Sequence, residues 1–254
     1  MREVRAKKFL GQHFLTDENI AKTIVDSLEI KSNVLEIGAG MGVLTKYLIP
    51  TTDNFKIVEI DSESVEYLHA NFPQLKGKII EGDFLKTSLT EIFNNEHFSL
   101  IGNFPYNISN LILFKVFENK NLIDQVVGMF QKEVADRVVA KSGSKTYGIL
   151  SVLLSAFYDM EYLITVPNTV FNPPPKVQSA VIRLKRNNVK DLGVKEEDFV
   201  RVVKTAFNQR RKMLRQSLKP LQMNLEGIDE KFKTLRPEQL SKDDFILLTQ
   251  QIYN

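Results

Sequence analysis

The pattern that most restricts the fold of this chain is a regular alternation of short β-rich runs with helical segments. The expected strands are residues 33–37, 55–60, 78–81, 99–102 and 125–130, and the expected helices are 17–28, 43–48, 62–71 and 111–118. Strands that alternate with helices predict a parallel sheet covered by helices on both faces. The first part of the chain is therefore expected to be a Rossmann-like α/β domain.

The end of this region departs from the alternation. Residues 147–158 have the pattern of a buried helix, and two expected strands follow at 161–166 and 179–184. The connection between these strands contains Pro167, Pro173, Pro174 and Pro175, which favour a stiff loop. We therefore expect a terminal hairpin at the sheet edge, with one strand antiparallel to its neighbours.

Strand patterns stop after a polar linker at residues 186–193. Helices are expected at 196–208, in a segment ending near 218, near 229–232 and at 241–252. The chain is thus predicted to contain an α/β domain at residues 1–187 and a small all-α domain at 188–254.

Composition excludes several kinds of site. The 254 residues include no Cys, which rules out disulfides, thiolate zinc sites and Cys nucleophiles, and the three His are scattered. No apolar run reaches the roughly 18 residues that a membrane helix needs, and no signal-peptide core follows the basic N-terminus. We expect a cytoplasmic monomer with no metal centre and no membrane contact.

A glycine-rich turn follows the first expected strand and opens a helix. Residues 36–42 read EIGAGMG, with the spacing GxGxG rather than the GxGxxG of dinucleotide folds, which disfavours a nicotinamide dehydrogenase. Glu59 ends the second strand, and Asp83 follows the third. The carboxyl ends of parallel strands meet at one edge, so these acids predict a nucleoside-type cofactor, with Glu59 at the ribose and Asp83 at an adenine amino group.

The fourth strand ends in a motif that suits an amino group on a ring. Residues 102–107 read GNFPYN. The amide oxygen of Asn103 and a backbone carbonyl just before or at Pro105 can both accept hydrogen bonds from one amino group, and Tyr106 can stack on the ring that carries it. This arrangement predicts a site for a flipped or single-stranded adenine.

Taken together, these motifs resemble the ribosomal RNA adenine dimethyltransferase family, specifically its bacterial small-subunit branch (KsgA/RsmA). The resemblance covers nearly the whole chain and is carried by residues 11–15 (GQHFL), 36–42, 59–61, 82–83, 102–109, 171–180 (FNPPPKVQSA) and 207–214 (FNQRRKML). It implies a class I methyltransferase sheet and S-adenosylmethionine as cofactor. The implied reaction is dimethylation of the exocyclic N6 of two adjacent adenosines in the 3′-terminal hairpin loop of 16S ribosomal RNA, during small-subunit maturation.

The resemblance also implies roles for single residues. The residues matched to the cofactor site are His13, Leu15, Gly38, Gly40, Glu59, Asp83 and Asn103. Of these, His13 and Leu15 would line the methionine end, and Asn103 would lie at the junction with the substrate. The residues matched to the catalytic site are Asn103, Pro105, Tyr106 and Phe171, with Tyr106 and Phe171 as an aromatic pair flanking the target base. Three positions depart from the common family pattern, namely His13 for Asn, Ala39 for Pro and Phe104 for Leu.

Residues 201–219 contain seven basic residues and no acid. Six of them fall together on a helical wheel, and we call them the basic stripe: Arg201, Lys204, Arg211, Lys212, Arg215 and Lys219. The seventh, Arg210, would lie in the apolar face of a straight helix, where an unpaired charge is costly. We therefore expect a helix break near 208–210 or an acidic partner for Arg210.

A second basic group lies at the N-terminus and consists of Arg2, Arg5, Lys7 and Lys8. Beside a base-binding motif, basic groups of this kind predict contacts with RNA phosphates. The resemblance implies that this RNA is 16S ribosomal RNA, and we expect residues 188–254 to dock on it.

Two alternatives stay open. One is a large-subunit ribosomal RNA methyltransferase, as in the antibiotic-resistance branch of the same family, although the FNPPPKVQSA and FNQRRK runs favour the small-subunit branch. The other is a non-catalytic RNA- or assembly-binding protein that has kept the fold. The intact motif from Asn103 to Tyr106, together with Glu59 and Asp83, argues against it, because a pure binder needs none of these residues.

Overall fold

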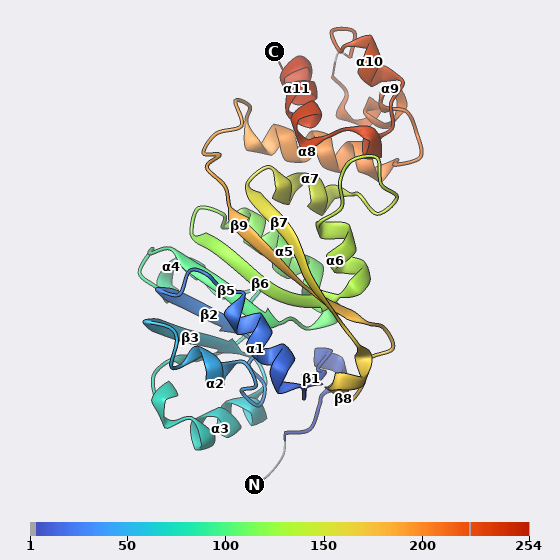
Figure 1. The fold of residues 1–254 in the computed structure, drawn as a ribbon. Coiled ribbons are helices and arrows are strands. Elements are labelled where there is room, and N and C mark those ends of the chain that lie inside the picture. The colour runs from blue at the N-terminus through green and yellow to red at the C-terminus, as the bar shows by residue number, and fades with distance from the viewer. Residues whose placement is uncertain (1–3, 224, 254) are drawn as a thin grey trace. The chain divides into compact units, whose positions relative to one another are not determined.

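The centre of the fold is a mixed seven-stranded sheet with the strand order β4-β3-β2-β5-β6-β9-β7 (Figure 1). The computed structural model describes residues 4–223 and 225–253, and Arg2 of the N-terminal basic group lies outside them. In sheet order the strands are Ile79–Glu81 (β4), Asn54–Glu59 (β3), Asn33–Ile37 (β2), Phe98–Asn103 (β5), Ile123–Gln131 (β6), Ser179–Arg186 (β9) and Tyr158–Val166 (β7).

Strands β4, β3, β2, β5 and β6 pair in parallel. Strand β9 pairs antiparallel with β6, with Gln131 opposite Ser179 and Gln125 opposite Lys185, and β7 lies beyond it at the edge. The expected parallel sheet with a terminal antiparallel hairpin is thus confirmed.

One boundary differs from the prediction for residues 147–158. Helix α7 (Ile149–Ser155) is shorter than expected, and β7 already begins at Tyr158. Phe157 and Tyr158 are buried, so they extend the apolar run of the helix in the sequence. A short apolar run cannot by its periodicity be assigned to a helix or a strand.

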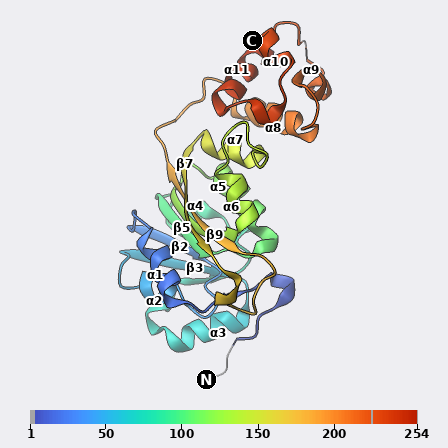
Figure 2. The ribbon, with the colours of Figure 1, turned by 45° about the vertical axis from the view of Figure 1, so that its right-hand side comes forward.

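Helices α1 (Glu18–Asp26), α2 (Thr45–Leu48) and α3 (Ser62–Asn71) pack on one face of the sheet (Figure 2). Alternate strand residues such as Val34, Ile57 and Ile101 form one buried cluster with them. The other face carries α4 (Leu89–Ile92) and α5 (Ser109–Glu118). There, Lys56 of β3 donates to the carbonyl of Ile92 at the end of α4. The alternation of buried side chains therefore builds a sheet that is covered on both faces.

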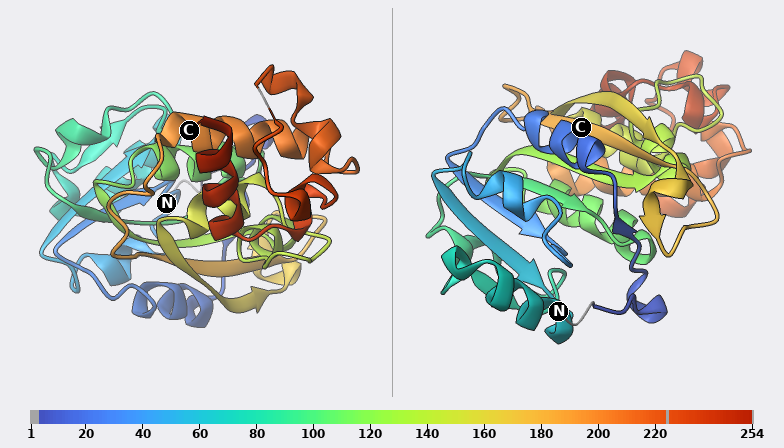
Figure 3. Two further views of the ribbon diagram at one scale, coloured as in Figure 1. Left: turned by 90° about the horizontal axis from the view of Figure 1, so that it is seen from above. Right: turned by 60° about the horizontal axis from the view of Figure 1, so that its bottom comes forward.

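The segment before α1 is fixed by a small second sheet. Strands β1 (Phe14–Leu15) and β8 (Phe171–Asn172) pair antiparallel, with Leu15 opposite Phe171. Figure 3 (right) shows the blue N-terminal segment beside the yellow strand β8. A 3₁₀ turn, η1 (Lys8–Leu10), precedes β1. The pairing holds the N-terminal segment against the first part of the chain.

The chain forms two compact units. The first contains the residues up to Ala135 and Met160–Arg186, and the second contains Asp136–Asp159 and the residues from Asn187 onward. In the second unit, α8 (Glu196–Asn208) packs against α7, α9 (Leu214–Ser217) and α11 (Lys242–Tyr253), and α10 (Glu230–Lys233) packs against α9. Helix α6 (Lys132–Val138) joins the two units along the chain.

The expected helix break in the basic region is confirmed. Helix α8 ends at Asn208, and α9 begins only at Leu214. Arg210 lies between them, where its Nη2 donates to the carbonyl of Lys145 at 2.5 Å and its Nε lies 3.8 Å from the Glu238 carboxylate. The guanidinium is therefore paired outside the apolar face. No helix in the described parts of the chain is long and apolar enough to cross a membrane.

Candidate active site

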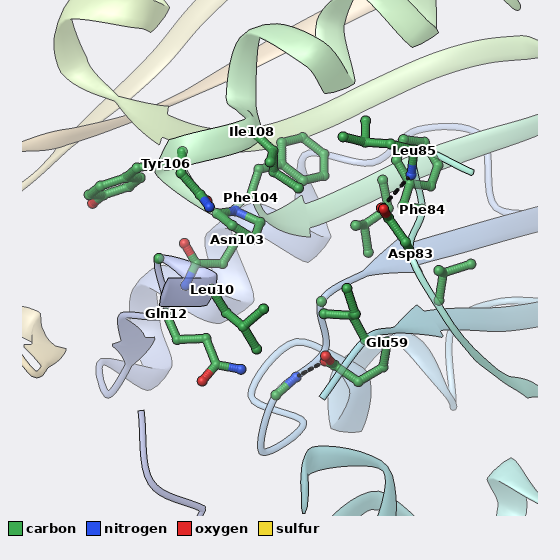
Figure 4. Close-up of a pocket in the computed structure, with 18 of the residues that line it drawn as sticks. Leu10, Gln12, Glu59, Asp83, Phe84, Leu85, Asn103, Phe104, Tyr106 and Ile108 are labelled. Atoms are coloured by element: carbon green, nitrogen blue, oxygen red, sulfur yellow. Dashed lines mark hydrogen bonds between the residues drawn. The ribbon is translucent and has the colours of Figure 1, made fainter. Parts of the chain in front are cut away.

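A pocket of about 250 Å³ opens at the carboxyl ends of the parallel strands (Figure 4). Each of β2, β3, β4 and β5 contributes the residues at or just after its end, and the N-terminal segment closes another side. The lining residues used below are Gln12, His13, Gly38, Gly40, Glu59, Asp83, Phe84, Leu85, Asn103, Phe104, Pro105 and Tyr106. The residues predicted from separate strand ends therefore share one cavity, as expected for an open α/β sheet.

The glycine turn after β2 forms the floor of the pocket. Gly38 has φ +67°, and a Cβ there would meet only the Pro105 Cδ, at 4.0 Å, so it would point into the open cavity. Gly40 has φ +54°, and a Cβ there would lie 2.8 Å from the Phe14 ring. Both positions favour glycine because side chains rarely adopt this backbone conformation. The turn therefore leaves room for a ligand directly against the backbone.

Glu59 holds this turn in place. One carboxylate oxygen accepts from the Gly40 N–H at 3.0 Å and the other from the Asp61 N–H at 2.9 Å. Burial raises the pKa of the Glu59 carboxyl, and the hydrogen bonds from the backbone act against this rise. Glu59 is thus both a pocket residue and a support for the glycine turn.

A second buried carboxyl, Glu36, lies next to the same turn. It is 1% exposed and accepts a hydrogen bond from Thr45 Oγ1 at 2.7 Å. Burial raises the pKa of Glu36 to about 8, and the charge of Glu59 adds to the rise. Glu36 therefore keeps a proton at neutral pH in the folded protein.

Replacing Glu36 by Gln is expected to remove a pH-dependent loss of stability. In the folded state the Glu36 carboxyl has a pKa of about 8, whereas in the unfolded state it has the ordinary value of 4.5. The free energy of unfolding therefore falls between these two pH values and is level above them. Glu36→Gln has no such titration, and we expect it to be about 2–4 kcal/mol more stable than the wild type at pH 8. Thermal unfolding from pH 4.5 to 8.5 measures this difference.

The control for this experiment is Glu66→Gln, which alters an exposed carboxyl on α3. It should follow the wild-type curve at every pH. A Glu36→Gln curve parallel to that of the wild type would contradict the raised pKa.

Asp83 marks the far end of the pocket, after β4. Its Oδ1 accepts from the Leu85 N–H at 2.9 Å, which folds the chain back into a tight turn (Figure 4). The Asp83 carbonyl accepts from the Lys86 N–H and the Thr87 hydroxyl, both at 2.9 Å. These bonds fix the backbone of the turn and leave the second carboxylate oxygen for a ligand.

Asn103, the last residue of β5, and Tyr106, three residues further on, both line the pocket (Figure 4). The Asn103 Nδ2 donates to the His13 carbonyl at 2.8 Å. The Tyr106 hydroxyl and Ser179 Oγ are 2.5 Å apart, and the Tyr106 ring stacks on His13 at 5.2 Å. Burial raises the pKa of the Tyr106 phenol, which therefore stays neutral. Both side chains have a fixed orientation before any ligand binds.

Phe104, which lies between these two residues in the chain, packs its ring against β5 and β6. Its side chain is 1% exposed, and its ring lies 5.0 Å from that of Phe130. Gly102 and Gly128 are partners across β5 and β6. A Cβ added at Gly102 would lie 2.8 Å from the Phe104 ring, and one added at Gly128 would lie 2.2 Å from it. The departure from Leu to Phe at this position is thus accommodated by the missing side chain of Gly128.

The N-terminal segment is tied to the pocket by a cluster around Asp61. Lys7 Nζ donates to Asp61 Oδ1, and Gln12 Nε2 donates to Asp61 Oδ2 at 3.0 Å. Burial alone would raise the pKa of Asp61, but the hydrogen bonds from Lys7 and Gln12 lower it below its ordinary value. The motif at residues 59–61 includes Asp61 but does not by itself indicate this role.

Of the residues matched to the site, Leu15 and Phe171 do not line this pocket, but Leu15 lines a smaller adjoining cavity together with Gly38, Gly40 and Asn103. Leu15 and Phe171 are each 4% exposed and belong to the apolar core, because they face each other across β1 and β8. His13, one residue before β1, does reach the pocket, and its Nδ1 lies 2.7 Å from the Pro173 carbonyl. The small sheet thus places His13 at the pocket, Leu15 at the adjoining cavity and Phe171 in the core.

The six residues of the basic stripe are all exposed in the second unit. Arg201 and Lys204 lie on α8, opposite its buried Val202 and Val203. Arg211 and Lys212 lie in the break, and Arg215 lies on α9. A single helical wheel therefore does not describe the stripe beyond Asn208. The described residues contain no group of three or more His, Asp or Glu side chains suited to a metal ion.

The sheet order and the glycine-lined pocket at the strand ends define a class I methyltransferase fold. The same fold occurs in the crystal structure of the 23S rRNA methyltransferase ErmE, with a TM-score of 0.71 at 22% identity over 95% of this chain and 100% of that one. The family described as Ribosomal RNA adenine dimethylase matches residues 3–253. The chain belongs to this family.

Individual relatives agree with this assignment. The chain is 56% identical over 254 residues to Ribosomal RNA small subunit methyltransferase A of Flavobacterium johnsoniae, covering 99% of this chain and 97% of that protein. It is 55% identical over 256 residues to the protein of that name from Cytophaga hutchinsonii, covering 99% of each. A dimethyladenosine transferase from Plasmodium falciparum has a similar crystal structure, with a TM-score of 0.78 at 26% identity over 93% of this chain and 96% of that one.

The family is one of S-adenosylmethionine-dependent methyltransferases, and the pocket fits this cofactor. The open space at Gly38 suits a close approach to the backbone, the two carboxylates suit hydroxyl and amino donors, and most of the wall is apolar.

We expect Glu59→Ala and Asp83→Ala each to weaken cofactor binding by about 1–3 kcal/mol, because each removes a hydrogen-bond acceptor. Calorimetry measures the affinity, and Glu66→Ala on the exposed side of α3 is the control. Unchanged affinity in both variants would contradict the assignment.

Proposed function

We propose that this protein transfers methyl groups to the exocyclic N6 of two adjacent adenosines in the 3′-terminal hairpin loop of 16S ribosomal RNA. The substrate would be the RNA within a small ribosomal subunit or its precursor. Relatives at 55–56% identity that carry the name Ribosomal RNA small subunit methyltransferase A support this substrate. The observation that carries the chemistry is the fixed amide of Asn103, whose nitrogen is bound to the His13 carbonyl.

The Asn103 amide accepts hydrogen bonds only through Oδ1, and the hydrogen bond from its Nδ2 to the His13 carbonyl fixes the direction in which this oxygen points. The second acceptor for the target amine is the carbonyl of Phe104. The alternative, the Pro105 carbonyl, already accepts from the Ile108 N–H at 3.2 Å and from Ser109 Oγ at 3.1 Å. Two acceptors on one amino group hold its lone pair toward the methyl donor.

S-adenosylmethionine, when bound, supplies an electrophilic methyl group on a sulfonium. An adenine amine is a poor nucleophile because its lone pair is delocalised into the ring. Asn103 Oδ1 and the Phe104 carbonyl favour a more tetrahedral nitrogen and stabilise the positive charge that develops on it, so they act by positioning and electrostatics. Tyr106 would stack on the base, and Phe171 would hold β1 in place behind it. The methylated nitrogen loses its proton easily, so no strong base is required.

We infer that residues 1–187 carry the methyltransferase reaction and that 188–254 dock on folded RNA through the basic stripe. The N-terminal residues Arg5 and Lys8, both on the surface, would hold the strand near the pocket. Contacts of this kind go to phosphates and position the RNA without reading its sequence. The protein would act as a monomer in the cytoplasm.

Methyl transfer from labelled cofactor to undermethylated small subunits tests the proposal. We expect label in 16S ribosomal RNA and primer-extension stops at two adjacent adenosines. Undermethylated large subunits are the parallel substrate. Label in the large-subunit RNA would instead favour the large-subunit alternative, and no label in either RNA would favour the non-catalytic one.

A further inference from the structure

Lys115 of α5 meets the turn at Asp83 from outside the pocket. Its Nζ donates to three carbonyls, those of Phe84 at 2.8 Å, Leu85 at 3.0 Å and Thr87 at 2.7 Å. An ammonium group has three donors, so all of them are used within one turn. The Nζ also lies 5.1 Å from the centre of the Phe84 ring. The turn is therefore folded around this one cation.

The same turn forms the end of the pocket. Phe84 and Leu85 line the cavity beside Asp83, and the Leu85 N–H is the donor that orients the Asp83 carboxylate. Burial lowers the pKa of Lys115, while the charges of Asp83 and Glu118 act in the opposite direction. Loss of the cation would leave three carbonyls without a shared donor and would release the backbone that directs Asp83.

We propose that Lys115 is a positioning residue that sets the geometry of Asp83 and thereby the selectivity of the cofactor site for adenine. This inference rests on the proposed function and on the prediction from sequence that Asp83 binds the adenine amino group of the cofactor. A carboxylate fixed in direction accepts from an amino group and repels the carbonyl oxygen of hypoxanthine at the same ring position. Lys115 would thus act on base selectivity without touching the cofactor.

The chain offers a matched control in Lys56. Its Nζ also donates to a backbone carbonyl, that of Ile92, and lies 5.3 Å from the centre of a phenylalanine ring, Phe93. Lys56 does not line the pocket. Replacing either lysine by Met removes a charge and the hydrogen bonds it makes, but only Lys115 contacts the turn at Asp83.

The experiment measures binding of S-adenosylhomocysteine and of its hypoxanthine analogue, S-inosylhomocysteine, to the full-length protein by calorimetry. For Lys115→Met we expect about tenfold weaker binding of the adenine ligand, as for loss of hydrogen bonds to a charged group, and a change of less than about threefold for the hypoxanthine ligand. Lys56→Met should match the wild type with both ligands. In an Asp83→Ala background, Lys115→Met should have no further effect on the ratio of the two affinities.

Wild-type selectivity in Lys115→Met would overturn the proposal, and so would an equal loss for both ligands, which would indicate a general loss of structure. If circular dichroism shows that Lys115→Met is unfolded, Lys115→Arg takes its place. The planar guanidinium keeps the charge but cannot meet the three carbonyls in the same way, so reduced selectivity is again expected and unchanged selectivity overturns the proposal. None of these measurements uses RNA. A failure here is therefore distinguishable from failure of the methylation assay.

Discussion

Asn103→Ala is expected to lower the turnover number by about 100- to 1000-fold, the usual effect of removing one group that stabilises developing charge. The affinity for RNA should stay close to that of the wild type, because the Asn103 contact matters most as the amine attacks. The variant also removes the hydrogen bond to the His13 carbonyl. Single-turnover methylation of small subunits at saturating cofactor measures the chemical step directly.

Two further variants make this result specific. Asn110→Ala removes an exposed amide on α5, within the same stretch of chain, and should methylate at the wild-type rate. Asn103→Asp keeps the shape but replaces the donor to the His13 carbonyl with a second oxygen, so it should be as slow as Asn103→Ala. A near wild-type rate for Asn103→Ala would refute the mechanism.

The second large effect is expected from the basic stripe. Replacing Arg211, Lys212 and Arg215 together by Gln should weaken binding to small subunits by about 100-fold at low salt and lower the salt slope of binding by about three, one for each lost phosphate contact. Cofactor affinity should not change, because the cofactor pocket is lined entirely by residues of the first unit. Filter binding across a salt series gives the affinity and the slope together.

Net charge alone would also weaken RNA binding, so the control must change it equally. Lys22, Lys76 and Lys78 are exposed lysines of the first unit, and their triple replacement by Gln removes the same three charges. We expect this control to keep most of the affinity and the salt slope. If the two triple variants behave alike, the stripe is an ordinary solvated surface and RNA docks elsewhere.

The features predicted correctly from sequence depend on neighbours along the chain. The strands around the pocket are short apolar runs, and their acids lie at strand ends, so the sequence alone is enough to place Glu59 and Asp83 at one edge of the sheet. The break after α8 is predictable for a similar reason, because a charge at position 210 does not suit the apolar face of a helix.

The features that sequence patterns miss depend on contacts between distant segments. Lys7 meets Asp61 across 54 residues, and Lys115 meets Phe84 across 31. In the sequence, Lys7 belongs to a basic N-terminal run, and Lys115 is a basic residue in a mostly apolar helix. The motifs of Leu15 and Phe171 predict a place in the pocket, and no local pattern reveals that β1 pairs with β8. This pairing packs Phe171 into the core and places Leu15 beside the smaller cavity at the glycine turn.

The packing of Phe104 has a consequence for how sequences of this family can diverge. A Cβ at Gly128 would lie 2.2 Å from the Phe104 ring, although the two positions are 24 residues apart in the chain. The same Cβ would lie 2.7 Å from the Phe130 ring, so a substitution at 128 requires the ring at 104 to give way to a smaller side chain and the Phe130 ring to shift. Positions 104 and 128 should covary among homologues, with Phe at 104 confined to chains that carry Gly at 128.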